Sequence, residues 1–176
     1  MSAIAKRYSS AIFELLDGNI KKDLVNKELK EMADLFRTNE EFRKVILNPI
    51  IDIDVKGEIL KSLLKSLRYS DLTEKSLYHI LEANRFDILP DISESLSKKV
   101  DISLKRQYVN IITARKLSEL ALSPVRKEVE RVLDGKKVIY NYEIDETIIG
   151  GVVVKINDNI YDFSIKKSLD KIKESV

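Results

Sequence analysis

Apolar residues recur at helical spacing through the first hundred positions of the chain. Between residues 3 and 16 they cover an arc that is wider than one packing seam requires. The arc consists of Ile4, Ala5, Tyr8, Ala11, Ile12, Leu15 and Leu16. The same period returns at about 22–37, 42–46, 54–67, 70–81 and 90–100. Six helices joined by short links predict a compact helical bundle.

Polar residues at the expected helix starts support these assignments. Thr38 and Glu41 have the spacing of a capping box, so we expect Thr38 to cap the third helix. Asp54 is our candidate cap for the fourth helix, and Ser70 or Asp71 begins the fifth. Pro90 suits the first turn of the sixth helix, where its missing N–H is not needed.

The pattern changes beyond residue 104. β-Branched residues at 107–114 predict a strand, and a helical pattern follows at 118–133. Residues 136–144 alternate between two faces, and 150–156 and 159–163 flank an Asn-Asp-Asn turn. A last helix carries Ile165, Leu169 and Ile172. The predicted fold is therefore α+β and mainly α, with a six-helix bundle at 1–104 and a small β-α-β-β-β-α module at 105–176.

Composition excludes several classes of protein. The 176 residues contain 31 Lys and Arg against 29 Asp and Glu, and this net charge of +2 is low for a dedicated nucleic-acid binder. No cysteine is present, so thiolate metal sites and cysteine nucleophiles are excluded. The N-terminus lacks the apolar core of a signal peptide, and no apolar run approaches the ~20 residues of a membrane span. We therefore expect no direct insertion into a membrane.

Candidate catalytic chemistry is sparse. His79 is the single histidine, and it lies on an expected helix without His or Cys ligands nearby. Carboxylates such as Glu40 and Glu41 occupy helix starts, where they interact favourably with the helix dipole. We expect no catalytic residue, no metal site and no cofactor.

The adjacent glycines Gly150 and Gly151 allow two interpretations. A phosphate-binding loop would require a helix directly after them, whereas the sequence continues into a strand. Close backbone packing or a bulge at the start of that strand is therefore favoured. On this interpretation, replacing Gly150 by valine damages folding of the C-terminal module before it affects any ligand.

An RNA-binding module with a helical extension is the alternative function that the residues leave open. The order of elements after residue 104 is similar to that of small RNA-binding modules, which stack bases on exposed aromatic residues. The candidate aromatic residues are Tyr108, Tyr140, Tyr142 and Tyr161. The alternation of the strands places some of them in the core.

Several segments resemble the δ subunit of F-type ATP synthases, which mitochondria call the oligomycin-sensitivity-conferring protein. The resemblance runs in order through residues 5–16, 46–60, 81–92, 111–118 and 144–169. The last of these is the most specific, and its marker residues here are Asp145, Ile149, Gly150 and Gly151. The family usually has glycines where this chain has Asn157 and Phe163.

The resemblance implies a non-catalytic stator subunit of a proton- or sodium-translocating ATP synthase. Such a subunit joins the α/β head to the b-subunit peripheral stalk, so that rotor torque drives ATP synthesis. It would be part of a hetero-oligomeric complex, on the cytoplasmic side of the cell inner membrane. The family's helical domain holds the N-terminal helix of an α subunit between its first and fifth helices, and its second domain contacts the C-terminal region of b.

The candidate partner-binding residues follow from the two expected partners, the α subunit for the helical domain and the b subunit for the second domain. For the α-subunit groove they are Tyr8, Ala11 and Ile12 on the first helix and Leu72, Lys75, His79 and Ala83 on the fifth. For the b subunit they are Ile165, Leu169 and Ile172, which serve core packing equally well. No nucleic acid is expected as a partner.

Overall fold

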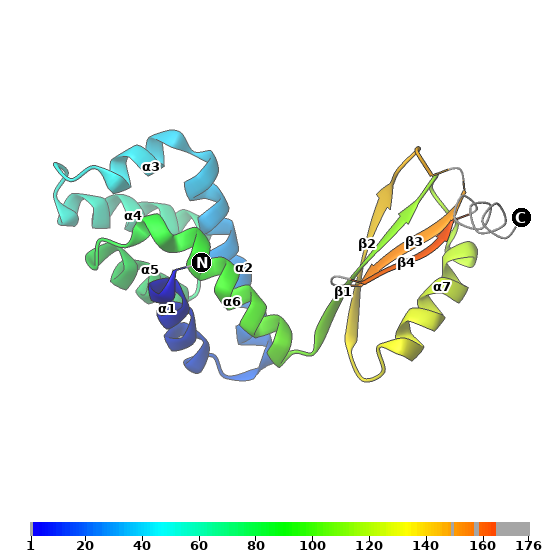
Figure 1. Ribbon diagram of the computed structural model, residues 1–176. Helices are drawn as coiled ribbons and strands as arrows, with labels where there is room; N and C mark the ends of the chain where they lie inside the picture. Colours follow the sequence, from blue (N-terminus) through cyan, green and yellow to red (C-terminus); the bar gives the residue numbers. More distant parts are fainter. Residues whose placement is uncertain (1, 149, 157–158, 165–176) are drawn as a thin grey trace, which may run out of the picture. The chain divides into compact units, whose positions relative to one another are not determined.

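The computed structural model describes residues 2–148, 150–156 and 159–164, and the chain divides into two compact units, Met1–Ile102 and Ser103–Val176 (Figure 1). The first unit contains α1 (Ala3–Glu14), α2 (Gly18–Thr38), α3 (Glu40–Leu47), α4 (Ile53–Leu67), α5 (Asp71–Glu82), the 3-10 turn η1 (Phe86–Ile88) and α6 (Leu89–Ser103). The second contains β1 (Arg106–Thr113), α7 (Glu119–Val132), β2 (Lys137–Ile144), β3 (Gly151–Ile156) and β4 (Asn159–Ser164). The protein is therefore α+β and mainly helical.

Two of the predicted helix caps are wrong by one or two residues. Thr38 is the last residue of α2, and its hydroxyl donates to the Asp34 carbonyl instead of capping α3. Asn39 caps α3, because its Oδ1 accepts a hydrogen bond of 2.9 Å from the Phe42 amide. Asn and Thr are both good N-caps, so composition alone cannot separate neighbouring candidates.

The predicted N-cap of α4 is also displaced, here by two residues. Asp52 is its N-cap and accepts from the Asp54 amide, whereas Asp54, the predicted cap, lies in the first turn. The prediction for Pro90 is confirmed, because it occupies the first turn of α6. Proline is tolerated there because the first amides of a helix have no partner inside it.

Apolar side chains from all six helices fill the core of the first unit. Members of this core that are completely buried include Leu29, Met32, Leu60, Leu77, Ile80, Ile92 and Leu96. An aromatic cluster joins α2, α3 and η1, where Phe36 lies edge-on to Phe42 and Phe86 with ring centroids 6.4 and 5.5 Å away. Edge-to-face packing of this kind adds about 0.5–1.5 kcal/mol per pair beyond simple burial.

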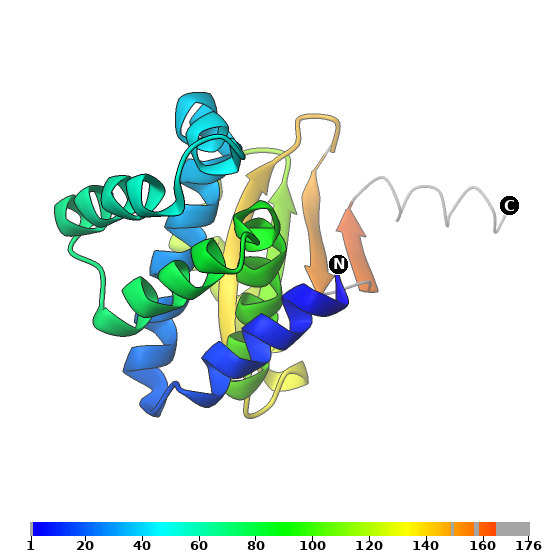
Figure 2. The same ribbon diagram turned by 90° about the vertical axis from the view of Figure 1, so that its left-hand side faces the viewer.

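Small polar residues let α1 lie directly on α6 (Figure 2). Ser9 and Ser95 are both buried, and their hydroxyl oxygens are 2.8 Å apart in a shared hydrogen bond. At the start of α1, the Ser2 amide donates to the Asp91 carboxylate at 3.2 Å. Serine permits a close approach of two helices, and the hydrogen bond satisfies both buried hydroxyls.

A buried carboxylate on α2 holds the beginning of α5. Glu28 is 6% exposed and accepts hydrogen bonds from the Ser70 amide, at 2.9 Å, and from the Ser70 hydroxyl, at 2.6 Å. The Thr73 hydroxyl donates to the same carboxylate. Ser70 is the N-cap residue of α5 but makes no cap bond of its own. Glu28 therefore satisfies the amide and hydroxyl of the N-cap residue, and it ties α5 to α2 across 42 residues of sequence.

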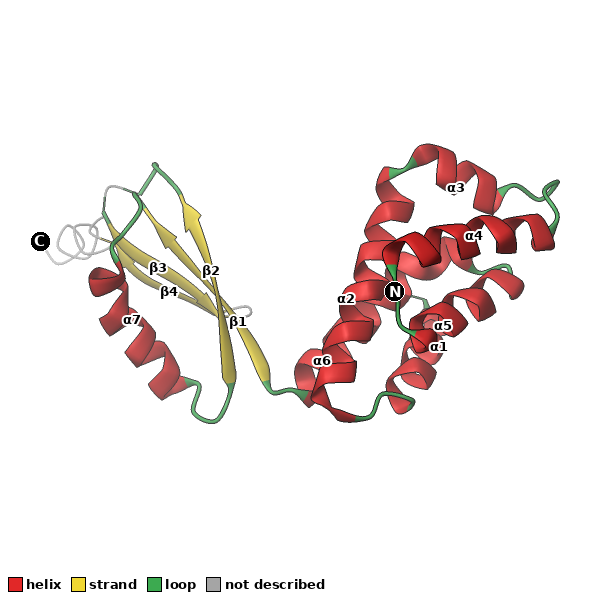
Figure 3. Cartoon of the chain, turned by 180° about the vertical axis from the view of Figure 1, so that it is seen from behind, coloured by secondary structure: helices red, strands yellow, loops and turns green. Residues whose placement is uncertain are grey.

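The second unit is a four-stranded sheet of order β2-β1-β3-β4 with α7 on one face (Figure 3). β1 and β2 are parallel, and α7 forms the crossover between them, while β3 and β4 are antiparallel neighbours. The core between sheet and helix contains Val109, Ile111, Leu122, Val129, Leu133, Val154 and Ile156. The four strands and α7 agree with the predicted elements to within one residue at each described end, and the predicted last helix lies outside the described residues.

We predict that Glu28→Ala lowers the free energy of unfolding of the first unit by about 1–3 kcal/mol, because buried donors of Ser70 and Thr73 lose their acceptor. Urea unfolding followed by circular dichroism measures this. The control is Glu94→Ala, which removes an exposed carboxylate 2.7 Å from the Lys98 ammonium and costs no more than about 0.5 kcal/mol. Equal losses in the two variants would contradict the role of Glu28.

Candidate partner-binding site

The wide apolar arc of α1 consists of two separate seams. Ala5, Ser9, Ile12 and Leu16 follow one another at intervals of three or four residues, and all four are buried in the bundle. Ile12 is only 5% exposed. It therefore belongs to the core, although the sequence had made it a candidate groove residue.

The second seam of α1 is turned away from the core. It contains Ile4, Tyr8, Ala11 and Leu15, which again have intervals of four, three and four residues. Ile4, Ala11 and Leu15 are exposed, Leu15 to 63%, and Tyr8 is half-buried. An apolar stripe at helical spacing that its own bundle does not cover is the form expected of a surface that receives another helix.

A surface hollow of about 400 Å³ lies along this second seam. Its lining is Ile4, Arg7, Tyr8 and Ala11 from α1, together with Arg85, two residues beyond the C-cap of α5. The hollow is thus apolar at its base, and two guanidinium groups line it. Sequence reasoning missed Ile4, Leu15 and the two arginines. Ile4 and Leu15 could have been identified from the sequence by dividing the apolar arc of α1 into two stripes, each with the helical period of 3.6 residues.

The four candidates on α5 share one flank of that helix. Leu72 is half-buried, whereas Lys75, His79 and Ala83 are exposed. His79 Nδ1 lies 3.4 Å from a Glu82 carboxylate oxygen, and its side chain is 76% exposed. These residues do not line the hollow beside α1. Lys75, His79 and Ala83 instead form an exposed and largely polar surface.

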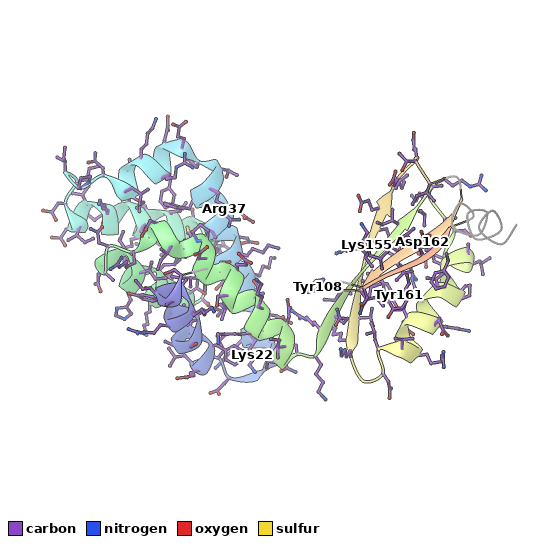
Figure 4. All side chains as sticks on the ribbon, viewed as in Figure 1. Lys22, Arg37, Tyr108, Lys155, Tyr161 and Asp162 are labelled. Atoms are coloured by element: carbon purple, nitrogen blue, oxygen red, sulfur yellow. The ribbon has the colours of Figure 1, made fainter. Side chains whose placement is uncertain are left out.

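The second unit has an apolar hollow of about 470 Å³ between α7 and the strands β3 and β4. Its apolar lining comes from Pro124, Val125, Val129 and Val132 of α7 and from Val152, Val154, Ile156, Tyr161 and Phe163 of the sheet. Figure 4 shows Tyr161 on the α7 side of the sheet and Tyr108 on the opposite side. The candidates Ile165, Leu169 and Ile172 lie outside the described residues.

Arg126 on α7 organises the tyrosines of β2. Its Nε donates to the Tyr142 hydroxyl at 2.7 Å, and its guanidinium carbon lies 5.6 Å from the centre of the Tyr140 ring. The Tyr140 hydroxyl donates to the Arg126 carbonyl at 3.3 Å. Burial, followed by the charge of Glu130, raises the pKa of Tyr140 to about 12. Tyr140 and Tyr142 are therefore held by α7 instead of forming an open platform for bases.

The double-glycine motif forms a turn and the start of a strand. Asp145 Oδ1 accepts from the Thr147 amide at 2.9 Å and from its hydroxyl at 2.6 Å, and these bonds hold the pKa of Asp145 below its ordinary value. Ile149 lies outside the described residues. Gly151 begins β3 with φ of 92°, a value that favours glycine, and Gly150 directly precedes it. The motif therefore shapes the backbone, and β3, not a helix, follows the glycines.

Phe163 stands where the family usually has a glycine. It lies in β4, opposite Val152 of β3, and is 66% exposed. An ordinary strand accommodates phenylalanine, and its ring contributes to the hollow beside α7. Asn157, the other departure, lies outside the described residues.

The part of the chain that the structure describes holds no cluster of three or more His, Asp or Glu residues that could bind a metal ion. Within the same residues, no helix combines the length and apolar character that crossing a bilayer requires. What the two units do offer are apolar hollows beside helices. The chain is therefore a two-unit α+β protein with apolar hollows on both units.

Comparison with known proteins identifies the family. The family model of the ATP synthase delta (OSCP) subunit matches residues 4–176, and the chain belongs to that family. It is 31% identical to the ATP synthase subunit delta of Desulfotalea psychrophila over 173 residues, which are 98% of this chain and 95% of that protein. It is 32% identical to the subunit delta of Trichlorobacter lovleyi, over 98% of this chain and 96% of that protein.

One solved structure shares the fold over nearly the whole length. A chain of the Toxoplasma gondii mitochondrial ATP synthase hexamer, solved by cryo-EM, superimposes with a TM-score of 0.61 at 16% identity. The match covers 99% of this chain and 97% of that one. The mainly helical α+β architecture is therefore that of a known fold.

We predict that Gly151→Ala destabilises the second unit by about 1–2 kcal/mol, because an L-residue is strained at a positive φ of 92°. The control is Gly57→Ala on α4, where an added Cβ meets no atom within 4 Å and where alanine stabilises a helix by about 0.5–1 kcal/mol relative to glycine. Thermal unfolding of both variants gives the comparison. A Gly151→Ala protein as stable as the parent would show that β3 tolerates a side chain there.

Proposed function

We propose that this protein is a non-catalytic stator subunit of an F-type ATP synthase. It joins the catalytic α/β head to the b-subunit peripheral stalk, so that the head does not turn with the rotor. Membership of the δ-subunit family supports this function. The coupling ion, proton or sodium, is a property of the membrane sector and not of this chain. Through the complex, the protein is peripheral on the cytoplasmic side of the cell inner membrane.

The observation that carries the proposal is the second seam of α1. Ile4, Tyr8, Ala11 and Leu15 form an apolar stripe on a helix whose other seam is already buried in its own bundle. The N-terminal helix of an α subunit would lie along this stripe, with Tyr8 as an aromatic anchor and Ala11 permitting close approach. Leu72, Lys75, His79 and Ala83 would border the helix from α5.

The charges around the hollow fit a particular kind of helix. Arg7 and Arg85 line it, and Lys75 is exposed on the neighbouring flank of α5. A partner helix with carboxylates beside its apolar face would pair with these cations. Such pairs at the rim favour rapid and correctly oriented association more than they add affinity.

The second unit is proposed to contact the C-terminal region of the b subunit. Its division from the first unit after Ile102 supports separate binding roles for the two units. Ile165, Leu169 and Ile172 remain the proposed contact residues. Phe163, which lines the apolar hollow beside α7, is two residues before this segment in the sequence.

RNA binding is the weaker alternative. An RNA-binding sheet needs aromatic rings that are free to stack on bases and a basic surface around them. Here Tyr140 and Tyr142 are bound by Arg126, and the net charge is only +2. Family membership favours the stator function over this alternative.

We predict that Ala11→Asp weakens binding of a synthetic α-subunit N-terminal peptide by roughly 100-fold or more, because it puts a charge where the partner helix must approach closely and competes with the partner's carboxylates for Arg7 and Arg85. The melting temperature changes little, since Ala11 is exposed. Isothermal titration calorimetry measures the affinity. Ser10→Asp, which puts the same charge on another face of α1, is the control and retains binding. Unchanged affinity in Ala11→Asp would mean that the groove lies elsewhere.

We further predict that a fragment of residues 1–104 retains the affinity for the α-subunit peptide but does not bind b. The reason is that the first unit has its own core, while the proposed b contacts lie at 165–172. Pull-down with the C-terminal segment of b, using the full chain as the positive control, tests this. Retention of b by the fragment would contradict the assignment of separate roles.

A further inference from the structure

A second groove lies between α4 and α5. Its lining is Ile53, Asp54, Gly57, Glu58 and Lys61 of α4 with Tyr78, Leu81 and Glu82 of α5, and its volume is about 680 Å³. The α4 residues recur at intervals of three or four, so they form one face of that helix. This groove shares no lining residue with the hollow beside α1.

Gly57 lies on the α4 side of this groove. It lies inside a helix of 15 residues, where glycine costs about 0.5–1 kcal/mol relative to alanine. A Cβ built on Gly57 meets no atom within 4 Å, so nothing within the bundle requires glycine there. A missing side chain on a groove wall does, however, let the backbone of another helix approach closely, as small residues do at helix contacts.

The groove is acidic. Asp54, Glu58 and Glu82 contribute three carboxylates, against the single ammonium group of Lys61. Burial, followed by the charge of Glu74, raises the pKa of Tyr78. Between the charges lie apolar atoms of Ile53, which is 41% exposed, and of Tyr78 and Leu81.

We propose that the α4–α5 groove is a second docking site, and that its occupant is a basic amphipathic helix of another protein. Apolar residues of that helix at i, i+3, i+4 and i+7 would cover Gly57, Tyr78 and Leu81. Its Lys or Arg side chains would pair with Asp54, Glu58 and Glu82. An anionic membrane surface does not fit this groove, because its carboxylates would be repelled.

The test uses the full-length chain labelled with ¹⁵N and two helical peptides of about 15 residues, one made of Leu and Lys and the other of Leu and Glu in the same pattern. We expect the Leu/Lys peptide to shift the amide resonances of residues 54–61 and 78–82. We expect the Leu/Glu peptide to leave them unchanged, and added salt to weaken the Leu/Lys complex.

Gly57→Leu fills the groove and is expected to reduce the affinity for the Leu/Lys peptide at least ~10-fold, without loss of thermal stability. Ser66→Leu is the matched control, since Ser66 is exposed nine residues further along α4, on the opposite face, and binding stays within ~2-fold. Should Gly57→Leu prove unstable, Glu58→Lys provides the second variant and weakens binding by reversing a charge.

Several results would overturn the proposal. They are amide shifts that map outside the two segments, equal binding of both peptides, or equal effects of Gly57→Leu and Ser66→Leu. A self-association of the chain that Gly57→Leu abolishes would assign the groove to a second copy instead. These measurements do not involve the ATP synthase head or stalk, so their failure leaves the proposed stator function untouched.

Discussion

The Ser9–Ser95 hydrogen bond joins α1 to α6 within the seam that α1 buries in its own bundle, and it satisfies two buried hydroxyls. Ala5, Ile12 and Leu16 are the other buried residues of that seam. Because this seam is the one that the bundle buries, the second seam of α1, with Tyr8 and Ala11, has no position in the core and remains at the surface.

The position of α5 depends on a contact far away in sequence. The hydroxyl of Ser70, the residue before α5, donates to Glu28 of α2, so the carboxylate ties the start of α5 to the bundle. A local serine cap would have accepted from an amide of the first turn and would not have joined two helices. The buried carboxylate thus makes the position of α5, and of the groove between α4 and α5, a property of the whole bundle.

The sequence predicted the elements well and their ends less well. Helical spacing and strand alternation repeat over many residues, so one ambiguous residue does not change the predicted element. An N-cap is a single residue, and the neighbours Thr38 and Asn39 were both suitable candidates for α3. Ile12 was misplaced because both seams of α1 are apolar, and only packing shows which one is covered. Arg85 could not be found at all, since its approach to α1 depends on the tertiary fold. The positive φ of Gly151 was likewise hidden from sequence.

The hollow beside α1 and the groove between α4 and α5 differ in charge. Arg7 and Arg85 line the hollow, whereas Asp54, Glu58 and Glu82 line the groove. Shape alone would not discriminate between amphipathic helices at these two surfaces. A helix with acidic flanks would be attracted to the hollow and repelled by the groove, and a basic helix would show the reverse preference. Under the two proposals above, charge would therefore assign each partner helix to its own surface of the bundle.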